Sequence, residues 1–196
     1  MLEMTKGSAH RCAILAVMVA VTRTTRGQWI EQGLKALAAG GPDKVRIEGL
    51  AQGLGVTKGG FYGCFADRTA LLEAMLDTWE REAIDEVLEQ AAGSGGDART
   101  KLRRAGQLTF ASERLLPIDL AIRDWARHDG AVARRLRRVD NRRMQYMRDL
   151  LSTFCSDPAE VEARAFLAFS LILGNHLLDT QHGTLTRNDV LARTRG

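Results

Sequence analysis

The sequence has few residues that break helices or cross-link a chain. Its 196 residues include only three prolines, and none interrupts the long stretches in which apolar residues recur at three- and four-residue spacing. The three cysteines, Cys12, Cys64 and Cys155, are an odd number without CxxC spacing. They therefore indicate neither a disulfide framework nor a zinc site, and they favour a reducing compartment.

Motifs for enzyme chemistry are also missing. The sequence contains no GxSxG, no P-loop and no HExxH, and its four histidines are dispersed without metal-ligand spacing. We therefore predict a cytoplasmic, non-enzymatic protein without a metal or cofactor.

Helical periodicity dominates the chain, and strict alternation over the length of a strand is hard to find. The pattern predicts an all-α fold, with an N-terminal three-helix helix-turn-helix domain followed by a helical bundle for ligand binding and dimerisation. The expected helices cover residues 25–39, 46–54, 57–64, 67–92, a segment after Asp97, 117–125, 131–154, 158–181 and a short stretch from 186. The predicted domains are 23–66 and 67–196.

Residues 1–22 form a separate N-terminal extension. An apolar run, 12–21, follows Lys6 and Arg11, but it is too short to span a bilayer and no small-residue cleavage site follows convincingly. We expect a natural start nearer Met18 or Val21, with the preceding residues either disordered, a loosely attached helix or an artefact of the assigned start. Export or membrane association through this run is the weaker alternative.

The stretch 47–65 has the spacing of a helix-turn-helix. Two short helices that cross at a tight turn need apolar residues at fixed offsets, and from Ile47 these are Leu50, Leu54, Val56, Phe61 and Cys64. Ala51 is the small residue at the crossing, and Gly55 occupies the turn position that favours positive φ. Thr57 is suited to cap the second helix, whose exposed side would face a DNA groove.

Residues 24–76 resemble the DNA-binding domain of the TetR family of bacterial transcriptional regulators, most clearly from Gly55 through Leu72. The resemblance implies DNA contacts from six side chains: Arg26, Arg46, Thr57, Lys58, Tyr62 and Arg68. Tyr62 and Arg68 would hold backbone phosphates. The family often has His at Cys64 and Lys at Arg68, and neither difference argues against binding, because Arg keeps the charge and Cys suits an apolar position.

Three glycines, Gly59, Gly60 and Gly63, lie on the side of the second helix that would face the groove. Each lowers helix stability by about 1 kcal/mol relative to Ala. Either the backbone must lie close to DNA, which would also help to order the helix, or the glycines are drift in a helix fixed by Phe61 and Phe65.

Charge is distributed unevenly along the chain. Residues 1–66 carry 8 basic and 4 acidic side chains, whereas residues 67–96 carry 2 and 8. A basic head on an acidic neighbour suits a protein that binds a polyanion. A second basic run, from Arg134 to Arg148, is interpreted as a solvated face, with an acidic effector or the acidic helix 67–92 as alternative partners.

The C-terminal domain is predicted to dimerise and to bind an effector. By resemblance, 131–154 and 158–181 would pair with their mates in a four-helix bundle, and 161–178 is apolar on nearly every side. An effector pocket or, alternatively, ordinary core is expected from ten residues: Met75, Trp79, Phe110, Trp125, Met144, Met147, Phe166, Phe169, Asn175 and His176.

Together these observations predict a homodimeric repressor that binds a pseudo-palindromic double-stranded operator and responds to a small-molecule effector. The alternative is a helical adaptor whose degenerate helix-turn-helix no longer reads DNA. Substitution of Tyr62 or Lys58 separates the two, because only a DNA reader loses affinity.

Overall fold

The computed structural model describes residues 24–93, 95–110 and 112–193, and within these ranges it contains helices and no strand. The expected N-terminal extension lies outside the described residues. The helices are α1 (Arg26–Gly40), α2 (Ile47–Gly53), α3 (Gly59–Tyr62), α4 (Arg68–Arg81), α5 (Val87–Gly93), α6 (Ala98–Phe110), α7 (Leu115–Ala126), α8 (Gly130–Leu151), α9 (Pro158–Leu177) and α10 (Arg187–Arg193). The predicted all-α architecture, a helix-turn-helix head followed by a helical bundle, is confirmed.

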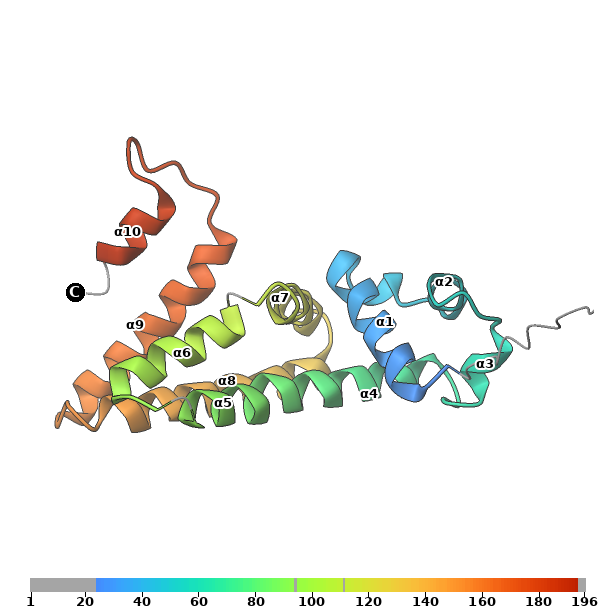
Figure 1. The fold of residues 1–196 in the computed structure, drawn as a ribbon, viewed down its shortest axis with the longest axis horizontal. Helices are drawn as coiled ribbons and strands as arrows, with labels where there is room; N and C mark the ends of the chain where they lie inside the picture. Colours follow the sequence, from blue (N-terminus) through green and yellow to red (C-terminus); the bar gives the residue numbers. More distant parts are fainter. Residues whose placement is uncertain (1–23, 94, 111, 194–196) are drawn as a thin grey trace, which may run out of the picture.

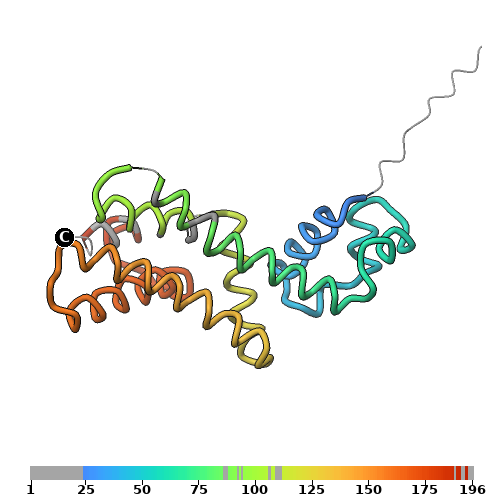
Figure 2. Tube along the Cα trace, turned by 90° about the horizontal axis from the view of Figure 1, so that it is seen from below, coloured from blue at the N-terminus to red at the C-terminus, as the bar shows by residue number. Residues whose placement is uncertain are grey.

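The molecule is elongated, with a small head joined to a larger helical body (Figure 1). Helices α1, α2 and α3 form the head, and α4 runs from the head into the body, where α5 continues it. Figure 2 shows the same connection from below, with the α4–α5 segment joining the two parts. Helices α9 and α10 lie at the end of the body far from α3, so one end of the molecule carries the helix-turn-helix and the other the C-terminal helices.

Side-chain caps begin most of the long helices. Thr25 and Gln28 form a reciprocal capping box at α1, with the Gln28 N–H donating to Thr25 Oγ1 at 3.3 Å and the Thr25 N–H donating to Gln28 Oε1 at 2.8 Å. Asp67, Asp129 and Asp157 accept backbone N–H groups at the starts of α4, α8 and α9. These boundaries are therefore set by local chemistry that the sequence displays.

One hydrophobic core extends from the head into the body. Trp29 and Leu34 of α1 are fully buried, and they belong to the same cluster as Ile122 of α7 and Val139 of α8. Gly33 lets α1 approach α4 closely, since a Cβ there would lie only 2.6 Å from Met75 Sδ. Movement of the body is therefore mechanically connected to the head through α1, α4 and α7.

Three differences from the predicted boundaries have a physical reason, besides shifts of one to three residues at other helix ends. The helix predicted over 67–92 contains a π-helical turn, Glu82–Glu86, between α4 and α5. The helix predicted over 57–64 is a single turn, Gly59–Tyr62, which is consistent with the low helix propensity of its glycines. Helix α9 ends at Leu177 rather than near 181. At this end, Arg187 donates hydrogen bonds to the backbone carbonyls of Asn175 and Leu178 at 2.9 and 2.5 Å.

Across residues 24–93, 95–110 and 112–193, no helix has both the length and the apolar character needed to cross a bilayer.

Candidate nucleic-acid interface

The head contains two short helices joined by a tight turn. Leu50 and Ala51 of α2 and Phe61 of α3 are buried at the crossing, as the apolar spacing predicted. Gly55 has φ +67°, a left-handed conformation that favours glycine, and the Val56 N–H donates to the Ala51 carbonyl at 3.0 Å. The turn therefore fixes α3 against α2, with one side of α3 facing solvent.

Aromatic packing holds this solvent-facing side in place. Phe61 is fully buried, with its ring centroid 5.3 Å from that of Trp29 in an edge-to-face arrangement and 5.4 Å from that of Phe65. Tyr62 lies edge-on to Phe61 at 5.3 Å and remains 55 % exposed. The buried ring of Phe61 thus anchors α3, while the phenol of the next residue is available to a ligand.

Lys58, just before α3, is ion-paired with Glu48 of α2. The side chains of both residues are substantially exposed, at 49 % and 69 %. Hydrogen bonding to Lys58 lowers the pKa of Glu48, and hydrogen bonding to Glu48 raises the pKa of Lys58. The lysine predicted to meet DNA therefore already has an acidic partner in the free protein.

Three other predicted contact residues lie around the same end of the head. The guanidinium of Arg26 lies over the Phe65 ring at 4.9 Å, and exposed Arg46 donates from Nε to the Asp43 carbonyl at 3.1 Å. The exposed Thr57 does not cap α3 with its side chain, contrary to expectation; its backbone carbonyl accepts from the Gly60 N–H at 3.1 Å.

Arg68 occupies a different environment from the other predicted contacts. Its Nε donates to the Val45 carbonyl at 2.6 Å, and its Nη2 donates to the Pro42 carbonyl. The side chain is partly buried and fastens α4 to the segment between α1 and α2. This structural role was not predicted, because the two carbonyls are more than twenty positions away in sequence. A phosphate contact from Arg68 remains a prediction from the family resemblance.

Gly59 and Gly60 are not required by the packing of the free head. A Cβ at Gly59 would come no closer than 3.8 Å to Thr57 Oγ1, and one at Gly60 no closer than 3.9 Å to Trp29. Gly63, which follows α3, has φ −78°, an ordinary right-handed conformation. The free head therefore has room for a larger side chain at Gly59 and at Gly60.

We expect Gly59→Ala and Gly60→Ala to stabilise the protein while weakening its binding to DNA. Alanine in a helix is favoured by about 1 kcal/mol over glycine, whereas an added methyl group would hold the backbone away from a groove. Urea unfolding and DNA titration of the same preparations measure the two effects, with Gly130→Ala in the body as the matched control. Unchanged DNA affinity would mean that these glycines have no role in recognition.

The ten residues predicted to form an effector pocket do not gather around one cavity. Met75 and Trp79 are buried in the core shared with the head, and Trp125 packs against that core, whereas Met144, Met147 and Phe169 belong to a second cluster between α8 and α9. Asn175 and His176 are partly buried near the end of α9. Phe110 is the last residue of α6, and its side chain lies outside the described residues.

Phe166 is a correction to the predicted pocket. Its side chain is 65 % exposed and lies on the outer side of α9, where Leu167, Leu171 and Leu177 are exposed as well. A residue this exposed does not line an internal cavity of the single chain. We call these four residues the apolar face of α9.

A buried ionic cluster, which was not predicted from the sequence, holds α4, α7 and α8 together. Asp119 is 1 % exposed and accepts hydrogen bonds from Arg143 Nη1 at 3.0 Å, Arg123 Nε at 2.9 Å and the Trp79 indole at 3.3 Å. Asp140 accepts from both terminal nitrogens of Arg123, at 2.8 and 2.6 Å. Two carboxylates and two guanidinium groups balance in charge. Only the i,i+4 spacing of Asp119 and Arg123 hinted at this cluster.

The basic run on α8 is therefore not simply a solvated face. Arg135 pairs with Glu73, Asp77 and Glu80 of α4, and Arg138 also pairs with Glu80. The alternative of pairing with the acidic helix is confirmed for these two arginines.

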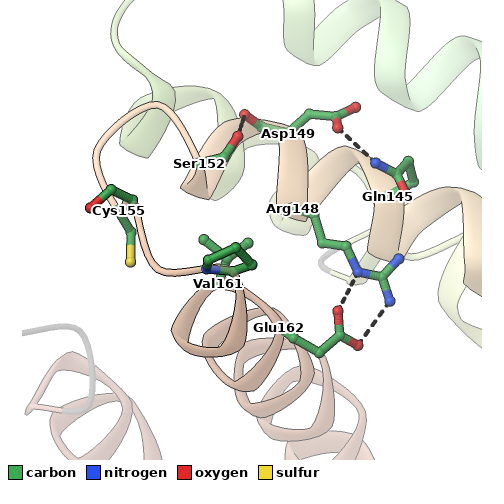
Figure 3. Close-up of a pocket in the computed structure, with 9 residues that line it drawn as sticks. Gln145, Arg148, Asp149, Ser152, Cys155, Val161 and Glu162 are labelled. Carbon is green, nitrogen blue, oxygen red and sulfur yellow. Dashed lines mark hydrogen bonds and ion pairs between the residues drawn. The ribbon is translucent and has the colours of Figure 1, made fainter.

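A surface pocket of about 390 Å³ lies at the turn between α8 and α9 (Figure 3). Arg148 and Glu162 point toward each other across it, with Nε and Nη2 of the arginine donating to the carboxylate at 2.5 and 2.9 Å. Cys155 and Val161 also line it. None of the ten residues predicted to form an effector pocket lines this surface pocket. Over the described residues, no group of three or more His, Cys, Asp or Glu side chains could hold a metal ion.

Comparison with known proteins supports the interpretation of the head. Residues 30–75 match the family model described as bacterial regulatory proteins, tetR family. No curated protein matches the chain in sequence.

Solved structures share the fold over most of the chain. One, from Saccharomonospora viridis and described as a transcriptional regulator in complex with choline, is 20% identical with a TM-score of 0.68, covering 87% of this chain and 91% of the other. A TetR-family transcriptional regulator from Bordetella parapertussis 12822 is 18% identical with a TM-score of 0.62, and the same shares of the two chains are covered.

The helix-turn-helix head on a helical body defines a DNA-binding transcriptional regulator. Residues 30–75 belong to the DNA-binding domain of the tetR family of bacterial regulatory proteins, and the fold of the chain is shared with solved transcriptional regulators along most of its length.

Proposed function

We propose that this protein is a ligand-responsive repressor that binds a pseudo-palindromic operator as a homodimer. The observation that carries the proposal is the solvent-facing side of the helix-turn-helix, where Tyr62 of α3, Lys58 just before α3 and Arg46 at the start of α2 are all exposed. A hydroxyl and cations at this position suit contacts to phosphates and base edges. We propose residues 23–66 as the DNA-binding domain, residues 67–196 as the effector and dimer domain, and the cytoplasm as the location.

Dimerisation is supported by the apolar face of α9. Phe166 and Leu167 are 65 % and 69 % exposed, and large exposed apolar side chains gathered on one side of a helix are typical of a covered surface. A dimer also doubles the few base contacts that one short recognition helix offers, with the two heads about 34 Å apart. We propose that α8 and α9 pair with their mates.

Effector response is supported by the connections between body and head. Arg114, just before α7, donates to Glu31 of α1 and Glu82 of the π-helical turn at 2.7 and 2.6 Å. The hydrogen bond from Arg114 lowers the pKa of Glu31. An effector that moves α7 relative to α4 would therefore shift the heads and change the population able to bind DNA. One structural neighbour contains choline, so a body of this fold can bind a small molecule.

We expect Tyr62→Phe to weaken DNA binding about fivefold for each head, and about 30-fold for the proposed dimer, because each head loses one hydrogen bond from the hydroxyl to a phosphate, worth about 1 kcal/mol. Fluorescence anisotropy with a labelled duplex measures the change. The chain offers a matched control in Tyr146→Phe, on α8 of the body, which should bind as the unaltered protein does. An adaptor with a degenerate helix-turn-helix would instead show no dependence on Tyr62.

A further inference from the structure

Glu48 is the one acidic residue between positions 44 and 66. The same stretch contains three basic residues, Lys44, Arg46 and Lys58. Within this stretch Glu48 is therefore the one source of negative charge, while exposed Asp43 and Asp67 lie just outside it. Its carboxylate forms an ion pair with Lys58, which immediately precedes α3.

The pair between Glu48 and Lys58 is not needed to hold the head together. Both side chains are exposed, and ion pairs of this kind contribute little to stability because water screens them. The crossing of α2 and α3 depends instead on buried Leu50, Ala51 and Phe61. The pair thus acts mainly on the electrostatics of the surface.

The other proposed cations keep their charge uncompensated by a carboxylate in the described part of the head. Arg26 lies over an aromatic ring, and Arg46 donates to a neutral backbone carbonyl. Lys58, in contrast, must exchange a carboxylate for any phosphate it contacts. The exchange leaves Glu48 unpaired beside the polyanion.

We propose that Glu48 restricts the binding of arbitrary DNA by occupying Lys58 in the free protein and by repelling the phosphate backbone once Lys58 is released. This inference rests on the DNA-binding function proposed above. Non-specific affinity comes almost entirely from phosphate contacts, so a carboxylate at this position lowers it directly. Operator binding has base contacts in addition, so the operator complex remains stable under the same penalty that makes binding to arbitrary DNA negligible.

The proposal has a signature in the dependence of affinity on salt. A lysine that is free before it meets a phosphate releases about 0.9 of a counterion from DNA. Lys58 exchanging Glu48 for phosphate releases less, because the abandoned carboxylate attracts a cation in return. Removal of the carboxylate should therefore steepen the salt dependence, and most strongly when Lys58 is present, because both the release of Lys58 and the loss of repulsion then contribute.

The experiment measures binding of the full chain to a labelled duplex of arbitrary sequence, about 30 base pairs long, between roughly 50 and 200 mM salt. We expect Glu48→Gln to bind about three- to tenfold more tightly at low salt, with a slope of log affinity against log salt steeper by about one per head. In a Lys58→Gln background, Glu48→Gln should change the slope by clearly less than it does in the unaltered protein, because only the repulsion by Glu48 is then removed. Glu89→Gln, an exposed position on α5, controls for net charge.

The possible results separate a failure of the role proposed for Glu48 from a failure of the proposed DNA-binding function. If the unaltered protein binds neither arbitrary duplex nor DNA beside its own gene, the proposed function fails. If it binds, but Glu48→Gln matches Glu89→Gln in affinity and slope, the inference is overturned while DNA binding stands. If Glu48→Gln instead loses affinity for one particular sequence, Glu48 accepts a hydrogen bond from a base such as cytosine, and the inference is again overturned.

Discussion

Replacing Asp119 with Asn is expected to lower the free energy of unfolding by about 3 kcal/mol. The carboxylate is 1 % exposed, and its loss deprives both Arg123 and Arg143 of their most buried carboxylate partner. Breaking a buried ion pair by removing one partner typically destabilises a protein by about 3–5 kcal/mol, since the remaining charge cannot regain its hydration. Urea unfolding at a fixed protomer concentration measures the change.

Asp140→Asn provides the matched comparison within the same cluster. This carboxylate is 25 % exposed, so water can compensate for its loss, and we expect about half the effect or less. Equal effects from the two substitutions would show that burial does not decide the contribution of each carboxylate. A change below about 1 kcal/mol for Asp119→Asn would contradict the structural role of the cluster.

Replacing Leu167 with Glu is expected to convert the proposed homodimer to a monomer. Leu167 is 69 % exposed on α9, so a carboxylate there leaves the fold of one chain intact. In a dimer that covers this face, two unpaired carboxylates would be buried, and each costs more than the roughly 1–3 kcal/mol of a neutral polar group without a partner. We therefore expect the dimer dissociation constant to rise about 100-fold or more, measured by analytical ultracentrifugation.

Leu185→Glu is the control, because Leu185 is also exposed but lies after α9, outside the apolar face of α9. It should leave the association state unchanged. A Leu167→Glu variant that remains dimeric would place the dimer interface elsewhere. A monomeric variant should also bind operator DNA far more weakly, since its two heads no longer act together.

The head was predictable from sequence because its constraints are local. A helix-turn-helix fixes apolar residues and a glycine at short offsets, and Leu50, Ala51, Gly55 and Phe61 occupy the predicted places in the structure. Asp67 and Asp157 likewise marked helix starts by their own side-chain chemistry. The length of α3 was overestimated, since its apolar positions matched a longer helix whereas its glycines favour a shorter one.

The body was less predictable because its decisive contacts join distant residues. Asp119 is 24 positions from Arg143 and 40 from Trp79 in sequence, and no periodicity in the sequence indicates that these residues are in contact. Phe166 and Phe169 are both aromatic residues of α9, yet one faces outward and the other is 9 % exposed in the second cluster. Membership of a pocket, a core or an interface depends on what packs against each side of a helix. That information appears only once the helices are assembled.

The central claim is sequence-specific DNA binding, and fluorescence anisotropy tests it most directly. The purified full chain is titrated against labelled duplexes tiled across the DNA beside its own gene, at several salt concentrations. We predict tight binding to one tile containing a pseudo-palindrome and weak, strongly salt-dependent binding to the others. Uniform weak binding to every tile, insensitive to substitution of Tyr62, would contradict the account.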